Sequence, residues 1–270
     1  MVEIALTNRS VENRYKGTPF DLAGKTAIVT GASGGLGYRF AEALAAAGAN
    51  LVVTARDDAH PRLQELKQSL QHVSVFTSPL DVASEESVQQ CLQGAVDEFG
   101  TVDILINNAG VAEPARAIDL QLDSWKRVTG VNLDGAWMVA REFGRHLIDA
   151  ESPGSIVNIT SILGHRVLSG VASYAVAKAG LEQMTRALAL EWARYSIRVN
   201  SIAPGYILTD MNRDYLLSDG AAKMISNIPQ KRVGKPADLD GALLLLASDA
   251  SAFMTGTTIT VDGGHTTSSL

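Results

Sequence analysis

Cysteine is almost absent from this chain of 270 residues, because Cys91 stands alone and no internal disulfide can form. Charge is also sparse, with 19% charged residues and a net charge of −6, so nothing indicates a nucleic-acid partner. No Lys/Arg run marks a membrane surface, and no apolar run reaches the ~18 residues of a transmembrane helix. The N-terminus lacks a basic-then-apolar signal pattern, and no His/Cys/Asp/Glu cluster has metal-site spacing. We therefore expect a soluble, cytoplasmic protein without a metal.

The length and the hydrophobic content of 46% fit one large α/β domain with a sizeable core. Residues 1–23 are mixed and mostly polar, and we interpret them as an arm before a single domain of residues 24–270. Short apolar runs alternate with helix-period segments, which predicts a doubly wound Rossmann-type domain, with a parallel sheet of about seven strands and helices on both faces. The runs that predict strands are KTAIVT, NLVVTA, HVSVFTSP, VDILINN, SIVNIT, IRVNSIAP and TGTTITV.

The stretch from Thr160 to Lys178 carries the residues best suited to chemistry. It follows a buried-strand pattern and leads into a helical pattern on which Tyr174 and Lys178 lie one turn apart. A lysine ammonium at that distance favours the phenolate, and Ser161 could hold a carbonyl oxygen as it becomes negative. The stretch predicts a site that passes a proton to or from an oxygen. We interpret His165 as a polar residue at the rim of its pocket.

A glycine-rich turn, GASGGLG, joins the first predicted strand to a helix. Its glycines let the backbone approach a pyrophosphate at the helix N-terminus, where side chains would block it, and Ser33 can hydrogen-bond a phosphate. This placement predicts dinucleotide binding, through the turn residues Gly31, Ser33, Gly35, Leu36 and Gly37.

The end of the second predicted strand bears on coenzyme choice. An NAD site usually places Asp or Glu there, whereas this chain has Ala55 and then Arg56, and a guanidinium suits a 2′-phosphate. NADP(H) is therefore favoured, and NAD(H) stays possible. The position before the middle glycine, Gly34, lacks a second basic residue, and Asp57 and Asp58 dilute the positive charge.

Taken in order, TGASGGLG, NNAG, Ser161, Tyr174, Lys178 and PGYILT resemble the motifs of the short-chain dehydrogenase/reductase family, from about Gly24 to Gly264. The resemblance implies reversible hydride transfer between a nicotinamide and a carbonyl carbon. Tyr174 would exchange the proton, Ser161 would position the oxygen, Lys178 would bind the nicotinamide ribose and lower the pKa of Tyr174, and Asn132 would support proton resupply. Further coenzyme contacts are implied for Asp81, Val82, Asn107, Ala109, Gly110, Pro204, Gly205, Ile207 and Thr209.

Two of these contacts have structural alternatives. Asn107 could instead bridge neighbouring strands through its amide, and Asp81 could be a helix cap or turn former. Asn132 falls inside a helical pattern, where an Asn invites a kink.

Assembly and the substrate lid are expectations as well. The predicted helix 174–192 is apolar on several faces, which predicts a subunit interface. The resemblance implies a homotetramer, with a dimer as the alternative. Residues 210–229 are polar and interrupted, and we expect them to form a lid over the substrate.

The expected substrate wall is largely apolar and suggests a ketone or secondary alcohol with a hydrophobic flank. We therefore expect an NADPH-dependent carbonyl reductase. Alternatives are a sugar-acid or polyol dehydrogenase, a 3-oxoacyl thioester reductase, and a non-catalytic NADP-binding regulator. A nucleotide-sugar epimerase would need a larger C-terminal domain than the chain has room for. The expected wall comprises Val111, Ala112, Ile162, Leu163, Val167, Leu168 and Tyr206.

Overall fold

The structure is a computed structural model that describes residues 17–210, 212–216 and 218–267. Most of the predicted N-terminal arm, residues 1–16, lies outside these ranges. Of the remainder of the arm, Leu22 is buried and its backbone amide donates to the Ala47 carbonyl at 2.8 Å. The end of the arm therefore packs against the core.

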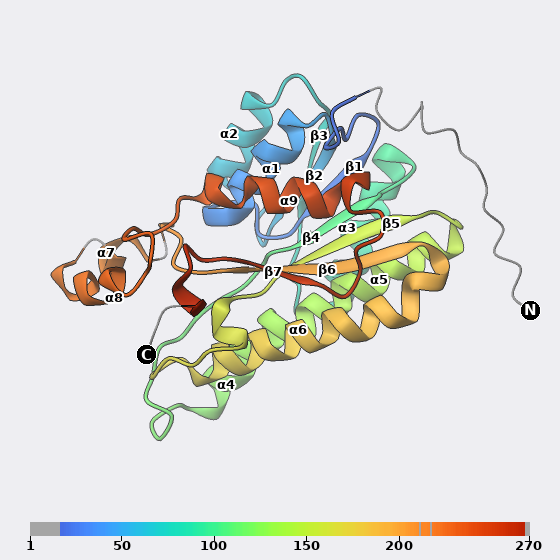
Figure 1. The fold of residues 1–270 in the computed structure, drawn as a ribbon. Helices are drawn as coiled ribbons and strands as arrows, with labels where there is room; N and C mark the ends of the chain where they lie inside the picture. The colour runs from blue at the N-terminus through green and yellow to red at the C-terminus, as the bar shows by residue number, and fades with distance from the viewer. Residues whose placement is uncertain (1–16, 211, 217, 268–270) are drawn as a thin grey trace, which may run out of the picture.

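A seven-stranded parallel sheet forms the centre of the molecule, in the order β3-β2-β1-β4-β5-β6-β7 (Figure 1). The prediction of a doubly wound parallel sheet is confirmed. Its central strands are buried on both faces, which is why they read as continuous apolar runs. The strands are β1 (Thr26–Val29), β2 (Asn50–Ala55), β3 (Val75–Pro79), β4 (Ile104–Asn107), β5 (Gly154–Ile159), β6 (Ile197–Pro204) and β7 (Thr258–Val261).

Helices cover both faces of the sheet and divide the core in two. Alternate residues of β1 point to opposite faces, so Ala27 and Val29 belong to one apolar cluster and Ile28 to the other. The first cluster packs under α1 (Gly35–Ala46), α2 (Pro61–Ser69) and α9 (Asp240–Ala247). The second packs under α3 (Glu85–Phe99), α5 (Ala136–Asp149) and α6 (Ala172–Trp192). Cys91 on α3 is buried in the second cluster, as expected of a packing residue.

The sheet reverses its direction of winding between β1 and β4. From β1 the chain proceeds to β2 and β3 on one side, and from β4 to β5, β6 and β7 on the other. The loops at the carboxyl ends of β1 and β4 therefore diverge and leave a crevice between them. Residues that follow β1, β4, β5 and β6 all gather at this edge.

A helical insertion leaves the sheet after β6 and returns before α9. It contains α7 (Arg213–Leu216) and α8 (Ala222–Ser226), which Figure 1 shows projecting beyond the sheet. A parallel bridge between Ile207 and Gly234 closes its base, where the Gly234 amide donates to Tyr206 and the Leu208 amide donates to Gly234. Residues 208–233 thus leave the rest of the chain and rejoin it at neighbouring positions.

Candidate active site

Lys178 lies one helical turn beyond Tyr174 on α6, and its side chain is buried, with only 4% exposed. Its Nζ donates to the carbonyl of Ile159, the last residue of β5, at 2.7 Å. The same atom lies 5.7 Å from the centroid of the Tyr174 ring. The lysine therefore ties the start of α6 to the carboxyl end of β5, and it holds a cation beside the tyrosine.

Ser161 completes this group from the loop that follows β5. Its side chain is largely buried, and its Oγ accepts a hydrogen bond from the Leu163 amide at 3.1 Å. That bond caps the short 3-10 turn Ile162–Gly164 and fixes the hydroxyl in place. The Ser161 side chain also lies close enough to Tyr174 to lower the pKa of the tyrosine. The structure thus brings together the serine, tyrosine and lysine that lie apart in the sequence.

Burial determines the ionisation of this pair. Loss of solvent raises the pKa of Tyr174 above its ordinary value, and the Ser161 side chain opposes the rise. Burial also lowers the pKa of Lys178 to about 8. The spacing alone predicts a lowered pKa for Tyr174, and the structure shows the reverse because desolvation of the phenolate outweighs the other effects.

Asn132 lies in a π-helical segment, Gly130–Gly135, between α4 (Leu122–Thr129) and α5. The predicted irregularity of this helix is confirmed. The Asn132 side chain is fully buried and pairs with the backbone of Val111, accepting from its N–H and donating to its carbonyl, both at 2.8 Å. Asn132 therefore positions the loop after β4 through its amide, and its part in proton resupply stays a prediction.

The glycine turn after β1 has the close approaches that its sequence predicts. Gly31 has a φ of +67°, and a Cβ on Gly37 would lie 2.3 Å from the Gly31 carbonyl oxygen. No acidic residue occupies the first turn of α1, so its N-terminal amides stay available to an anion. Ser33 lies in the turn itself, half-buried, whereas Leu36 packs against the first apolar cluster. This cradle fits the pyrophosphate of a dinucleotide.

Thr30 and Asn108, which were not among the predicted site residues, hold this turn in place. The Thr30 Oγ1 accepts from the amides of Asn108 and Ala109 at 2.9 Å, and the Asn108 Nδ2 donates to the Thr30 carbonyl at 2.9 Å. They fasten the loop after β4 to the loop after β1 across the crevice. In the sequence, Thr30 lies beside Gly31 and Asn108 lies within NNAG, and these positions could have identified both residues as part of the site.

Asn107 is structural in this protein. Its Nδ2 donates to the Ala136 carbonyl at 2.7 Å and to the Asn158 Oδ1 at 3.2 Å, and its side chain is buried. The alternative in which the amide bridges elements therefore fits the structure, and a contact of Asn107 with the coenzyme stays a prediction. Among its neighbours, Ala109 and Gly110 lie in the loop that follows, where a Cβ on Gly110 would come 3.3 Å from the Asn132 Oδ1.

Arg56 follows β2 as expected, exposed and without an ion pair to any described residue. A second guanidinium, that of Arg62 at the start of α2, lies 3.3 Å from where a Cβ on Gly34 would be. Arg62 also stacks over the Tyr38 ring at 5.3 Å and pairs with Asp210 at 2.5 Å. The structure thus brings a cation to the Gly34 position, where the sequence has none.

Asp81 and Val82 follow β3. The Asp81 carboxylate accepts from the Ala83 amide at 3.0 Å, which is the turn-forming role. Val82 is buried, and its side chain would lie 2.8 Å from a Cβ on Gly135. Contact of either residue with adenine stays a prediction.

The PGYILT loop follows β6 and leads into the base of the insertion. Gly205 packs closely on Asp262, where a Cβ would come within 2.7 Å of the Asp262 Cβ, and the Pro204 that precedes it ends β6. Ile207 is buried in the first apolar cluster. The Thr209 side chain lies 3.6 Å from where a Cβ on Gly35 would be. Both strand-end loops therefore border one crevice.

A cavity of about 900 Å³ lies between the loop after Ser161, the insertion and the segment after β7. Five of the residues predicted for the substrate wall line it, and Val111 and Ala112 do not. The predicted five are Ile162, Leu163, Val167, Leu168 and Tyr206. His165 is not among the lining residues, and its Nδ1 lies 3.2 Å from the Glu182 Oε1.

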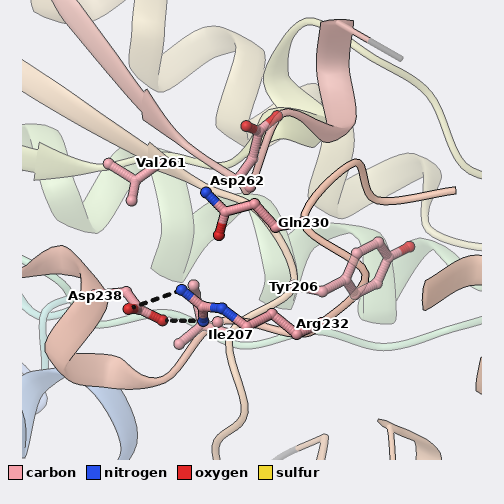
Figure 2. A pocket seen from close by; sticks show the side chains of 9 residues that line it. Tyr206, Ile207, Gln230, Arg232, Asp238, Val261 and Asp262 are labelled. Atoms are coloured by element: carbon pink, nitrogen blue, oxygen red, sulfur yellow. Dashed lines mark hydrogen bonds and ion pairs between the residues drawn. The ribbon is translucent and has the colours of Figure 1, made fainter. Parts of the chain in front are cut away.

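A second cavity, of about 170 Å³, lies at the base of the insertion. Figure 2 shows Arg232 and Asp238 facing each other there, joined by an ion pair of 2.6 Å. The guanidinium of Arg232 holds the pKa of Asp238 below its usual value. Tyr206 borders both cavities. This cavity lies where the insertion joins the rest of the chain, and none of the predicted catalytic side chains lines it.

Two kinds of site are not found among the residues that the structure describes. No three His, Cys, Asp or Glu side chains in this part of the chain are grouped to hold a metal ion. No helix within it is long and apolar enough to cross a membrane.

Known proteins and solved structures are similar to this chain over most of its length. A family model described as Enoyl-(Acyl carrier protein) reductase matches residues 31–266. Glucose 1-dehydrogenase 2 of Bacillus subtilis is 37% identical, over 91% of this chain and 96% of that protein, and sorbose reductase sou1 of Schizosaccharomyces pombe is 39% identical, over 91% and 97%. The crystal structure of a gluconate 5-dehydrogenase from Burkholderia cenocepacia in complex with NADP and tartrate is 33% identical, with a TM-score of 0.88 over 93% of this chain and 98% of that one.

The assignment of Asn107 leads to a stability test. Asn107→Leu keeps the branched shape of the side chain but removes its hydrogen bonds to the Ala136 carbonyl and the Asn158 Oδ1, so we expect the free energy of unfolding to fall by about 1–3 kcal/mol. The dissociation constant for NADPH should stay within about twofold. Urea unfolding and a fluorescence titration measure the two quantities.

Asn108→Leu is the matched control, because it loosens the glycine turn and should weaken NADPH binding. If Asn107→Leu instead weakens binding and leaves stability unchanged, Asn107 contacts the coenzyme after all.

Proposed function

This chain belongs to the short-chain dehydrogenase/reductase family of NAD(P)-dependent oxidoreductases, and within it we propose an NADP(H)-preferring enzyme that interconverts a ketone and a secondary alcohol. One observation carries the proposal. Ser161, Tyr174 and Lys178 meet at the carboxyl end of β5, and Ile162 and Leu163, which directly follow Ser161, line a cavity of about 900 Å³.

The chemistry divides between the coenzyme and the chain. NADP(H), when bound, supplies or accepts the hydride at the carbonyl carbon. Ser161 donates a hydrogen bond to the carbonyl oxygen and stabilises its developing charge. Tyr174 gives that oxygen a proton during reduction and takes it back during oxidation. Lys178 holds a positive charge beside Tyr174 and would bind the ribose next to the reacting ring.

The ionisation of the pair favours reduction at neutral pH. Because burial raises the pKa of Tyr174, its side chain is the phenol, which is the form that donates a proton. Oxidation needs the pair to lose one proton. The state in which Tyr174 is ionised and Lys178 is charged contains as many protons as the state in which both are neutral, so the two side chains titrate together.

Two guanidiniums support the preference for NADP(H). Arg56 has no ion pair among the described residues, and Arg62 supplies a cation beside Gly34. A guanidinium matches a phosphate in charge and in its forked geometry. Relatives with solved structures also bind this coenzyme, including the gluconate 5-dehydrogenase described above.

The relatives named above act on sugars or a sugar acid, which favours the sugar-acid or polyol alternative over the expected hydrophobic flank. A 3-oxoacyl thioester remains the other candidate. A non-catalytic regulator is disfavoured, because Ser161, Tyr174 and Lys178 are all present and placed for catalysis.

We also propose that residues 208–233 act as the substrate lid, since this insertion forms one wall of the large cavity and its two ends lie side by side at the Ile207–Gly234 bridge. This range contains the whole of the predicted lid, 210–229. The assembly we propose is a homotetramer, with a dimer as the alternative. On α6, Leu181 and Leu188 are buried, whereas Val176 and Leu190 are 50% and 84% exposed, as an interface would require. On compositional grounds we place the protein in the cytoplasm.

Tyr174→Phe tests the reaction. Loss of the hydroxyl removes the proton donor, so kcat for ketone reduction should fall by about 10²–10⁴-fold while the dissociation constant for NADPH stays within about twofold. A panel of sugar acids, polyols and simple ketones, followed by the absorbance of the reduced nicotinamide, identifies the substrate for the assay. Tyr195→Phe, a change at an exposed tyrosine, is the control. Near-normal turnover in Tyr174→Phe would remove Tyr174 from the mechanism.

The coenzyme assignment is tested with 2′,5′-ADP and 5′-AMP, which differ in one phosphate. In Arg56→Asp the dissociation constant for 2′,5′-ADP should rise at least about tenfold, because a charge-assisted contact of about 1.5–3 kcal/mol is lost. Arg62→Gln should raise it by a smaller factor. Binding of 5′-AMP should change little in either variant. A wild-type enzyme that binds both ligands equally would show that neither arginine contacts the 2′-phosphate.

A further inference from the structure

The walls of the large cavity come from three separate parts of the chain. Ile162 and Leu163, which directly follow Ser161, come from the loop after β5. Lys223 on α8 and Lys231 just after it come from the insertion, and Thr266 comes from the segment after β7. A molecule bound here would contact the insertion at one end and the catalytic loop at the other.

The charged Arg, Lys, Asp and Glu side chains that the structure describes in this wall are all of one sign. Arg166, Lys223 and Lys231 line the cavity, and none of the described Asp and Glu side chains does. None of the three forms an ion pair with a carboxylate of the described chain, although ion pairs occupy many of its other arginines. The chain as a whole has a net charge of −6, so this local excess of positive charge opposes its overall balance.

Two of the three cations are held in place by the backbone. The Arg166 Nη2 donates to the Thr266 carbonyl at 2.7 Å, and this single bond leaves its other N–H groups for a ligand. The Lys231 Nζ donates to the Ser226 carbonyl at 2.6 Å. Lys231 also has a φ of +55°, which is uncommon for a residue with a side chain. Backbone strain of this kind gathers at ligand sites.

From this wall we propose that the substrate carries a carboxylate, at the end of the molecule away from the reacting carbonyl. The inference rests on the proposed function and names its substrate class as small keto acids and hydroxy acids. A carboxylate would pair with the three cations, whereas an uncharged hydrophobic flank would desolvate them without a partner. The apolar residues Ile162 and Leu163 would then face the carbon chain between the two ends.

A matched pair of substrates tests the class. The sugar acid 5-keto-gluconate and the keto sugar L-sorbose differ in one group, a carboxylate in place of a primary alcohol. We expect the carboxylate form to have the higher kcat/KM. In Lys223→Met and Lys231→Met, its KM should rise about threefold to tenfold, with kcat little changed. The triple variant with Arg166→Met should lose most of the discrimination between the two substrates. Lys67→Met, at an exposed lysine outside the cavity, should change neither constant.

A second measurement does not require turnover. Calorimetric titration of the full chain with succinate, butane-1,4-diol and inorganic phosphate separates a carboxylate from its neutral analogue and from a phosphate. Succinate should bind, butane-1,4-diol should not, and the triple variant should lose the succinate signal. If succinate binding depends on the three cations in an enzyme that turns over no member of the substrate panel, the wall is correct and the proposed reaction is not.

Three results would overturn the inference: equal use of both sugars, succinate binding that survives the triple variant, or binding of phosphate in preference to succinate. In each case Tyr174→Phe reports separately on the reaction, because Tyr174 is not part of the cationic wall.

Discussion

The hydrogen bond from the buried Lys178 ammonium to the Ile159 carbonyl is the interaction on which the site depends. It joins the first turns of α6 to the carboxyl end of β5, and so places Tyr174 beside Ser161. Burying an ammonium is unfavourable, which is why the pKa of Lys178 falls to about 8. The same burial makes Tyr174 reluctant to ionise. One packing constraint therefore sets both the geometry and the protonation of the catalytic group.

The rest of the fold brings other polar elements to the same edge. Thr30 and Asn108 fasten the glycine turn to the loop after β4, and Asn132 holds that loop from a π-helical segment. Because all seven strands are parallel, the loops at their carboxyl ends gather on one side, between the two halves of the sheet. The insertion 208–233 then adds a wall with two cations of its own.

Much of this could be predicted from the sequence, because it depends on local patterns. Apolar runs of strand length identify all seven strands, and the four-residue spacing of Tyr174 and Lys178 places them on one helix face. The positions of the cationic side chains in the folded protein could not be predicted in the same way, because they depend on contacts between distant parts of the chain. Arg62 lies far along the chain from Gly34, and the two meet only once β2 and α2 are packed.

The pKa of Tyr174 was also beyond the sequence, and the sequence left the role of Asn107 open between a bridge and a coenzyme contact. The first depends on how completely the hydroxyl is desolvated, which packing decides. The second depends on which carbonyls lie opposite the amide, and these turn out to be those of Ala136 and Asn158. The sequence also predicted a largely apolar substrate wall. Only the fold shows that Lys223 and Lys231 of the insertion line the same cavity as the predicted apolar residues.

The pH dependence of kcat/KM for alcohol oxidation, in the wild type and in Lys178→Met, tests the coupled pair most directly. In the wild type, loss of one proton from the pair should begin near the Lys178 pKa of about 8, so activity should rise with pH and level off above it. In Lys178→Met only Tyr174 remains to titrate, and burial holds its pKa above the ordinary value of about 10. The rise should therefore move to more alkaline pH by about two units or more. A variant with lower activity but an unshifted rise would contradict the account, because Lys178 would then position the ribose without taking part in the ionisation of Tyr174.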